Sequence, residues 1–269
     1  MCQADALSNF TVYFDSYVTL YQCQRCSFVA QYPELGRQTI VEDYEHFYSL
    51  DFVKQGKQFQ YPERTNSFID MVERLKKIVG SQARVLDVGS GEGHFMSIAE
   101  SRGLECVGVE PSSTLADYAT TRVAGEVKKG YYHKELFPPE SFDAVTLVQV
   151  LEHLVDPGAA LDTAYYHLRP GGVVMIEVPS ILAPHFLAYR LTGIQKFVKP
   201  PTGVIYSHVG YFSPHSLVYL AQRHKFKTHH ITTGRWRVKY HGLLKAIATI
   251  TDPIMNVLKI GGILYFGKK

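Results

Sequence analysis

Cysteine, long apolar runs and an excess of charge of either sign are all scarce in this chain of 269 residues. Four cysteines are too few for a disulfide framework in a protein of this length, which predicts a reducing, cytoplasmic location. The sequence has no uncharged apolar stretch of about eighteen residues, so no transmembrane helix is expected. Residues 1–10 lack the charged and apolar segments of a secretory signal.

Charge is nearly balanced. The formal net charge is +3 with 12 histidines, and lysine and arginine form no dense run. This composition does not favour nucleic acid as a partner. The apolar fraction of 46% is enough for a full core, and the length suits one large α/β domain with a cap, or two small domains.

The most informative stretch runs from residue 83 to 93. A short apolar run, Val85 to Val88, is followed by glycines at positions 89, 91 and 93, after which the apolar pattern resumes. This pattern predicts a buried parallel strand, a tight glycine turn and the start of a helix. Such a turn bares backbone N–H groups and lets a ligand approach closely, although a purely structural turn would read the same way.

The spacing of these glycines distinguishes two cofactor classes. A dinucleotide fingerprint, G-x-G-x-x-G, would need its third glycine where this chain has His94. A nicotinamide oxidoreductase is therefore disfavoured. The chain has D-x-G-x-G-x-G instead, starting at Asp87, and Glu110 ends the next expected strand. This arrangement resembles the first motif of class I S-adenosylmethionine (SAM) methyltransferases.

Downstream of the glycine turn, expected strands alternate with expected helices, which predicts a doubly wound α/β sheet. An amphipathic helix precedes the turn, and Ser112, Asp156 and Ser213 are expected helix N-caps. The expected strands cover residues 105–110, a short segment at 127, and residues 141–148, 173–178, 226–233 and 262–267.

Taken together, several ordered stretches resemble the UbiG-like, type 11 and type 23 class I methyltransferases over residues 62–269. The resemblance implies a Rossmann-like, doubly wound sheet of seven strands with only the last strand antiparallel. It also implies SAM as cofactor, S-adenosylhomocysteine (SAH) as product and a small-molecule acceptor. The matching stretches are 85–93, 107–111, 137–143, 150–157, 168–172 and 208–217.

The same resemblance assigns cofactor-binding roles. Glu110 would accept hydrogen bonds from the ribose hydroxyls. Gln149 would line the amino-acid end of the cofactor, or be a polar loop residue without a ligand. The family often has an acidic residue beside the adenine, where this chain has Tyr131, which could stack on the base or simply pack. The full predicted set is Asp87, Gly89, Ser90, Gly91, Glu110, Pro111, Tyr131 and Gln149.

Two histidines are candidate catalytic residues. His153 follows the expected strand at 141–148, on the edge where open α/β sheets bind ligands. His208 precedes Tyr211 in a loop that the family places over the acceptor. We expect His153 to be the base that takes the acceptor proton and His208 to bind the acceptor, with the roles open to exchange. A structural role for either histidine also remains open.

Residues 1–60 are expected to form an N-terminal cap, ahead of a SAM-binding domain at 61–269. Cys23 and Cys26 have the C-x-x-C spacing of half a zinc ribbon, and Cys2 or His46 could complete a ligand set. Two thiols without metal are the favoured alternative. An aromatic cluster between residues 44 and 61 is expected to pack on the core or close over the cofactor.

Two inserts, near 181–205 and 241–258, look amphipathic. They are expected to form a helical lid or a homodimer contact, or else to meet a hydrophobic acceptor or transiently a membrane surface. The leading functional hypothesis is a SAM-dependent methyltransferase that acts on a small molecule, most readily at a hydroxyl oxygen. The alternative is a catalytically silent subunit that binds SAM or serves as a scaffold.

Overall fold

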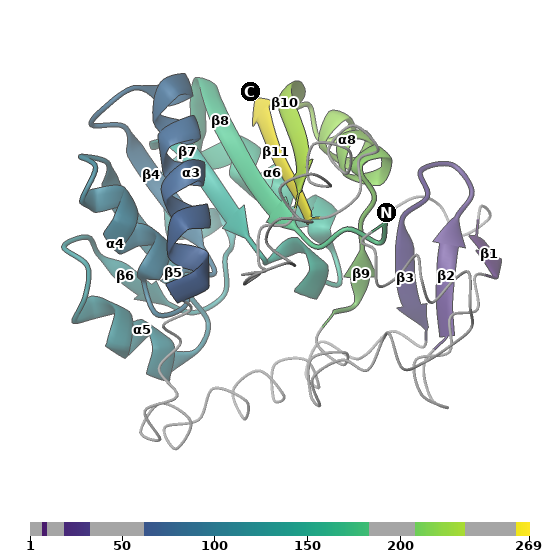
Figure 1. The fold of residues 1–269 in the computed structure, drawn as a ribbon, viewed down its shortest axis with the longest axis horizontal. Coiled ribbons are helices and arrows are strands. Elements are labelled where there is room, and N and C mark those ends of the chain that lie inside the picture. Colours follow the sequence, from purple (N-terminus) through teal and green to yellow (C-terminus); the bar gives the residue numbers. More distant parts are fainter. Residues whose placement is uncertain (1–6, 10–18, 33–61, 183–207, 235–261) are drawn as a thin grey trace, which may run out of the picture.

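The computed structural model describes residues 7–9, 19–32, 62–182, 208–234 and 262–269. A seven-stranded sheet forms the centre, in the order β10-β11-β8-β7-β4-β5-β6 (Figure 1). Its strands are β4 (Arg84–Val88), β5 (Glu105–Glu110), β6 (Val127–Lys129), β7 (Phe142–Val148), β8 (Leu168–Val178), β10 (Lys227–Gly234) and β11 (Gly262–Lys268).

The strand directions confirm the predicted topology. The pairs β4–β5, β4–β7, β5–β6 and β7–β8 are parallel, while β11 runs antiparallel to both β8 and β10. Only the last strand is therefore reversed. The chain crosses over at β4, because β5 and β7 flank this strand on opposite sides, and that switch point is where open α/β sheets bind ligands.

Helices cover both faces of the sheet. Two apolar clusters fill the interfaces: α3 and α4 pack in one, and α6 and α8 in the other. The caps follow the sequence, since Ser112, Asp156 and Ser213 each accept a backbone N–H of the helix that they start. The helices are α3 (Pro62–Val79), α4 (His94–Glu100), α5 (Ser113–Thr120), α6 (Pro157–His167) and α8 (Pro214–Arg223).

One strand is longer than the sequence predicted. β8 begins at Leu168 rather than near residue 173, because Leu168 pairs with Phe142 ahead of a shift in the β7–β8 register. The glycines at 171 and 172 lie within this first part of the strand, so they do not delay it. In the part of the chain that the structure describes, no helix is both long and apolar enough to cross a membrane.

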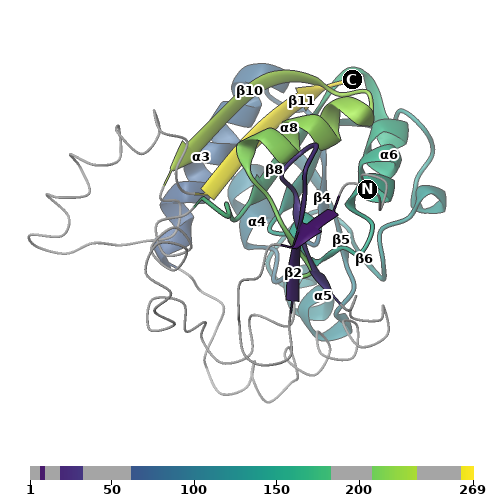
Figure 2. The ribbon, with the colours of Figure 1, turned by 90° about the vertical axis from the view of Figure 1, so that its right-hand side faces the viewer.

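A second, four-stranded sheet lies at the side of the molecule, near α8 (Figures 1 and 2). It consists of β1 (Leu7–Asn9), β2 (Thr19–Cys23), β3 (Val29–Tyr32) and β9 (Gly210–Tyr211). The N-terminal strands are thus hydrogen-bonded to a strand from the C-terminal half. The domain boundary near residue 60 stays a prediction, and the aromatic cluster at 44–61 and most of both inserts lie outside the described residues.

Candidate active site

The glycine loop lies between β4 and α4, at the carboxyl edge of the sheet. Gly89, Gly91 and Gly93 have φ angles of 69°, 55° and 76°, in the left-handed region that glycine adopts without strain. A Cβ atom at Gly89 would lie 2.6 Å from Cγ2 of Val150, whereas one at Gly91 would meet nothing within 4 Å. The loop therefore needs glycine for its turn and leaves open space at Gly91, where a ligand could approach.

Glu110 ends β5 and is fully buried. Its carboxylate accepts the N–H of Gly91 at 2.8 Å and the N–H of Ser112 at 2.9 Å. These bonds fix the carboxylate between the glycine loop and the start of α5. A carboxylate is an acceptor with about four lone-pair positions, the kind of group that accepts hydrogen bonds from paired hydroxyls.

Asp87, at 2% exposure, lies within β4 beside Thr146 of β7. The Thr146 hydroxyl donates to its carboxylate over 2.6 Å. Burial raises the pKa of Asp87 from 3.8 to about 7; the Thr146 hydrogen bond opposes this rise and the charge of Glu110 adds to it. A cation brought close to this carboxyl would favour its charged form, as an ammonium or sulfonium group would.

Arg64, in the first turn of α3, is a candidate that the sequence reading missed. Its Nη2 donates to Glu177, at the end of β8, over 2.6 Å, and its guanidinium lies 4.6 Å from the centre of the Phe68 ring. The side chain is nearly buried, and Nε has no hydrogen-bond partner among the described residues. A buried guanidinium with a spare donor suits a ligand carboxylate.

Two residues beside the glycine loop, His94 and Gln149, are hydrogen-bonded to α3 and to β8. His94, the residue that breaks the dinucleotide fingerprint, is hydrogen-bonded to Thr65 of α3 over 3.2 Å. Burial, with the charges of Arg122 and Arg64, lowers the pKa of His94. Gln149, with φ at 59°, follows β7, and its N–H donates to the Glu177 carbonyl over 2.8 Å.

The two candidate catalytic histidines lie together. His153 belongs to a single 3₁₀ turn, Leu151–His153, that follows β7, and His208 lies two residues before β9. Their rings are 4.7 Å apart between centroids, at an angle of 74°. Potential ligand atoms of Glu152, His153 and His208 all lie within 4.8 Å of one another, close enough to hold one metal ion. Glu152 is 1% exposed and both histidines are half-buried.

Two other predicted site residues can be located. Tyr131 is 48% exposed and follows Gly130, whose N–H donates to the Glu110 carbonyl over 2.9 Å. Tyr131 is therefore near the end of β5, and its contact with adenine stays a prediction. Cys23 and Cys26 are buried, but no third ligand joins them among the described residues. Cys2 and His46 lie outside those residues, so zinc at this position is untested.

The residues at this edge fit SAM. The open space at Gly91 would admit the cofactor, and the Glu110 carboxylate, fixed beside the loop, is a suitable acceptor for ribose hydroxyls. Asp87 would lie toward the positive charges of the methionine end, and the spare Nε donor of Arg64 suits its carboxylate. No single one of these features is specific, but together they complement the sugar and both charges of one molecule.

The comparisons with known proteins agree with this geometry. The family model described as "Methyltransferase domain" matches residues 60–231. A ubiquinone biosynthesis O-methyltransferase from Bradyrhizobium sp. (strain ORS 278) is 33% identical over 105 residues, 36% of this chain and 40% of that protein. The ubiquinone/menaquinone biosynthesis C-methyltransferase UbiE of Geotalea daltonii is 26% identical over 192 residues, 65% of this chain and 80% of that protein.

Solved structures share the fold. A SAM-dependent methyltransferase from Thermotoga maritima superposes with a TM-score of 0.58 at 20% identity, over 85% of this chain and 99% of that one. Several curated relatives are matched over half of their own length or less. The family model, however, covers more than half of this chain. The chain belongs to the methyltransferase-domain family of class I SAM-dependent methyltransferases.

Proposed function

We propose that this chain transfers a methyl group from SAM to a small-molecule acceptor, at a hydroxyl oxygen. The observation that carries the choice of oxygen is the pairing of His153 with His208, 4.7 Å apart beside the end of β7. Methyl transfer to a hydroxyl requires a group that removes a proton, and a histidine side chain is suited to that task near neutral pH.

The cofactor supplies an activated methyl group on a sulfonium, so the protein mainly aligns the donor with the acceptor. Alignment of this kind contributes roughly 7–11 kcal/mol of barrier reduction. In this chain, Glu110 would hold the ribose through its fixed carboxylate, and Arg64 and Asp87 would hold the charged methionine end. Gln149, kept in a left-handed conformation next to Glu177, would set the boundary between cofactor and acceptor.

His153 is the proposed base, and His208 would orient the acceptor oxygen. In the reaction the acceptor O–H gives its proton to the neutral imidazole, the oxygen forms a bond to the methyl carbon, and the carbon–sulfur bond breaks toward sulfur. The products are the methyl ether, SAH and a protonated histidine that returns its proton to water. Because Glu152 is adjacent and buried, its carboxylate would stabilise the positive charge that forms.

The acceptor class is drawn from chemistry and from the relatives. The names of the matched proteins cover methylation at oxygen, carbon and nitrogen, so family membership alone leaves the acceptor atom open. A proton-accepting histidine pair favours a hydroxyl or an acidic carbon over an amine that is already neutral. A phenolic or enolic hydroxyl is the acceptor that we would test first.

Two measurements test the proposal. Isothermal titration with SAH and with NAD should show binding of SAH alone, and binding of NAD alone would reject the cofactor assignment. Methyl-labelled SAM, incubated with a panel of phenols, amines and carbon acids, should give labelled methyl ethers identified by mass spectrometry. Tight SAH binding with no transfer to any acceptor class would instead support the catalytically silent scaffold, the second candidate function.

A further inference from the structure

The strand that follows His208, β9, links the proposed acceptor site to the N-terminal hairpin, which consists of the antiparallel strands β2 and β3. Val209 donates its N–H to the Glu152 carbonyl over 2.9 Å, which ties the start of this segment to the turn that carries His153. Further along, Phe212 accepts the N–H of Ile181 over 2.8 Å. The backbone on either side of β9 is therefore fixed to residues that follow β7 and β8.

β9 is fixed on its other side by the hairpin. β3 pairs with β9 in antiparallel register, with Val29 opposite Tyr211 and Ala30 opposite Gly210. This pairing is only two residues long, and so few ladder bonds leave the position of the strand sensitive to side-chain packing.

Phe28 of the hairpin supplies part of that packing. The Phe28 ring lies 4.9 Å from the Phe212 ring, at 55°, and it also covers Gly210. A Cβ atom added at Gly210 would come within 2.7 Å of Cζ of Phe28, so the ring and the strand are in close contact. Phe212 is fully buried in the main core. Phe28 thus connects the hairpin to both the short strand and the core of the catalytic domain.

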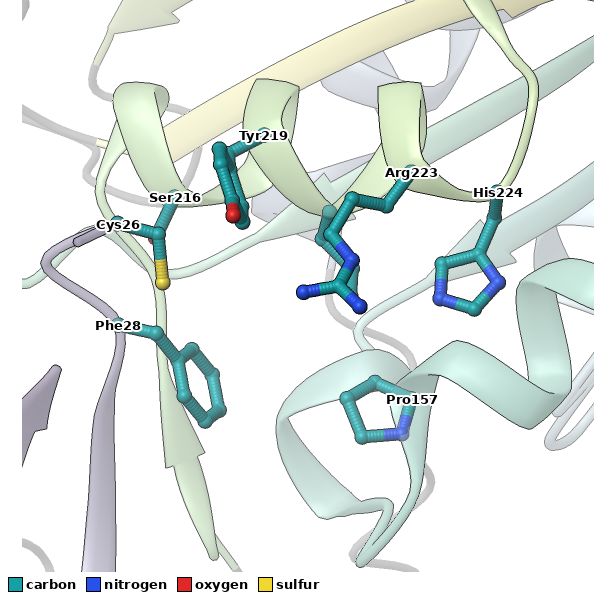
Figure 3. Close-up of a pocket in the computed structure, with 8 residues that line it drawn as sticks. Cys26, Phe28, Pro157, Ser216, Tyr219, Arg223 and His224 are labelled. Atoms are coloured by element: carbon teal, nitrogen blue, oxygen red, sulfur yellow. The ribbon is translucent and has the colours of Figure 1, made fainter. Parts of the chain in front are cut away.

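The other side of Phe28 borders a cavity of about 160 Å³ between the hairpin, α8 and the start of α6 (Figure 3). Cys26, Pro157 and Tyr219 are among its lining residues. Close packing on one side and open space on the other leave the ring room to move away from β9. The contact between Phe28 and β9 is consequently adjustable, unlike the contacts of a fully enclosed core residue.

We propose that Phe28 is a positioning residue of the acceptor site: by holding Gly210 and Phe212, it sets the distance between the His208 and His153 rings. The hairpin then helps to position the acceptor site, although its residues lie far from both histidines in sequence. The importance of this distance for catalysis rests on the proposed function. The placement of the two rings does not, and it can be measured without any acceptor.

The test compares Phe28→Ala with the conservative variant Phe28→Leu. The readout is the nuclear Overhauser effect between ring protons of His153 and His208 in histidine-labelled protein, assigned with His153→Gln and His208→Gln. Phe28→Ala should weaken this signal several-fold, and Phe28→Leu should restore most of it. Gly210→Ala displaces the Phe28 ring without removing it and should weaken the signal as well. This variant replaces Phe28→Ala in the test if Phe28→Ala fails to fold.

The matched control is Tyr165→Ala, which removes another half-buried aromatic ring, packed 5.4 Å from Phe226 rather than on β9. It should lower the melting temperature and leave the histidine signal unchanged. A weakened signal in Tyr165→Ala, or an unchanged one in both Phe28→Ala and Gly210→Ala, would overturn the proposal. Titration with SAH in the same samples separates the proposed function from the positioning role of Phe28. If the wild type does not bind SAH, the proposed function is rejected, and the result on the position of the rings still holds.

Discussion

The two halves of the candidate site are built in different ways. The centre of the cofactor region, from the glycine loop to Glu110, comes from one continuous strand–loop–helix–strand unit, in which Glu110 binds Gly91 and Ser112 close by in sequence. Thr146 and the Arg64–Glu177 pair are added to it from more distant parts of the chain. The acceptor region joins Glu152 and His153 to His208, and through β9 to Phe28. A motif in the sequence can report the first kind of site, whereas only the folded chain assembles the second.

The difference also appears in the chemistry. In the cofactor region, two buried carboxylates are held by backbone N–H groups and by a threonine hydroxyl. The acceptor region has half-buried histidines on a single 3₁₀ turn and on the approach to a two-residue strand. A family whose members share one cofactor but use different acceptors would show this contrast between the cofactor region and the acceptor region. Substitutions in the two regions should therefore separate binding from turnover.

The largest effect is expected at His153. His153→Ala should keep SAH affinity and lower kcat about 10²- to 10⁴-fold, because the acceptor proton loses its base. His208→Ala should mainly raise the KM for the acceptor. Steady-state kinetics with an acceptor from the labelling screen would measure both. Near-normal kcat in His153→Ala together with loss of activity in His208→Ala would show that the two roles are reversed.

The next effect concerns stability and pH at Asp87. Its folded-state pKa of about 7 lies above the ordinary value of 3.8. Between these two pH values the carboxyl is therefore protonated in the folded chain and ionised in the unfolded chain. This group therefore lowers the free energy of unfolding as the pH rises from about 4 to about 7, by at most about 4 kcal/mol. Asp87→Asn lacks the titration, so its stability relative to the wild type should rise across that window in urea unfolding. A constant difference between pH 5 and pH 8 would contradict the assignment.

A smaller loss is expected at Glu110. Glu110→Gln should weaken SAH binding by about 1.5–3 kcal/mol, because hydrogen bonds from the ribose hydroxyls to a charged acceptor are lost. The N–H groups of Gly91 and Ser112 bind different oxygens of Glu110, so glutamine keeps an acceptor for only one of them, and the fold of the variant has to be checked by its melting temperature. Glu126→Gln, an exposed change near the same strand, is the control. Unchanged affinity in folded Glu110→Gln would reject the ribose contact.

Arg64 tests the other end of the cofactor. Arg64→Lys keeps a positive charge beside buried Glu177 but removes the planar guanidinium, so SAH affinity should fall about tenfold. Binding of 5′-methylthioadenosine, which has no amino-acid part, should not change. Arg74→Gln, on the same helix and paired with exposed Asp70, is the control. Equal losses for both ligands would mean that Arg64 supports the fold and does not contact the carboxylate.

These two regions also mark how far the sequence could predict the site. Asp87, the glycines and Glu110 follow each other with fixed spacing. The strand alternation predicted the doubly wound sheet, and the family resemblance implied its seven strands and its one reversed strand. Arg64 could not be found this way, because an arginine on a polar helix face gives no sign that it reaches Glu177, 113 residues away. The sequence named His153 and His208 separately, but their contact depends on a β9 register that no local pattern encodes.

The smallest effect is expected at the C-x-x-C turn. Any zinc in the purified protein should be held by Cys23 and Cys26, and Cys23→Ser with Cys26→Ser should reduce it below about a tenth of an equivalent by elemental analysis. SAH affinity should not change, because the turn is closed by backbone bonds, from Cys23 N–H to the Phe28 carbonyl at 2.7 Å and from Ser27 N–H to the Cys23 carbonyl at 2.8 Å. A full equivalent of zinc in the double variant would contradict this prediction. It would direct attention to the acceptor region, where Glu152, His153 and His208 lie close enough to hold one ion.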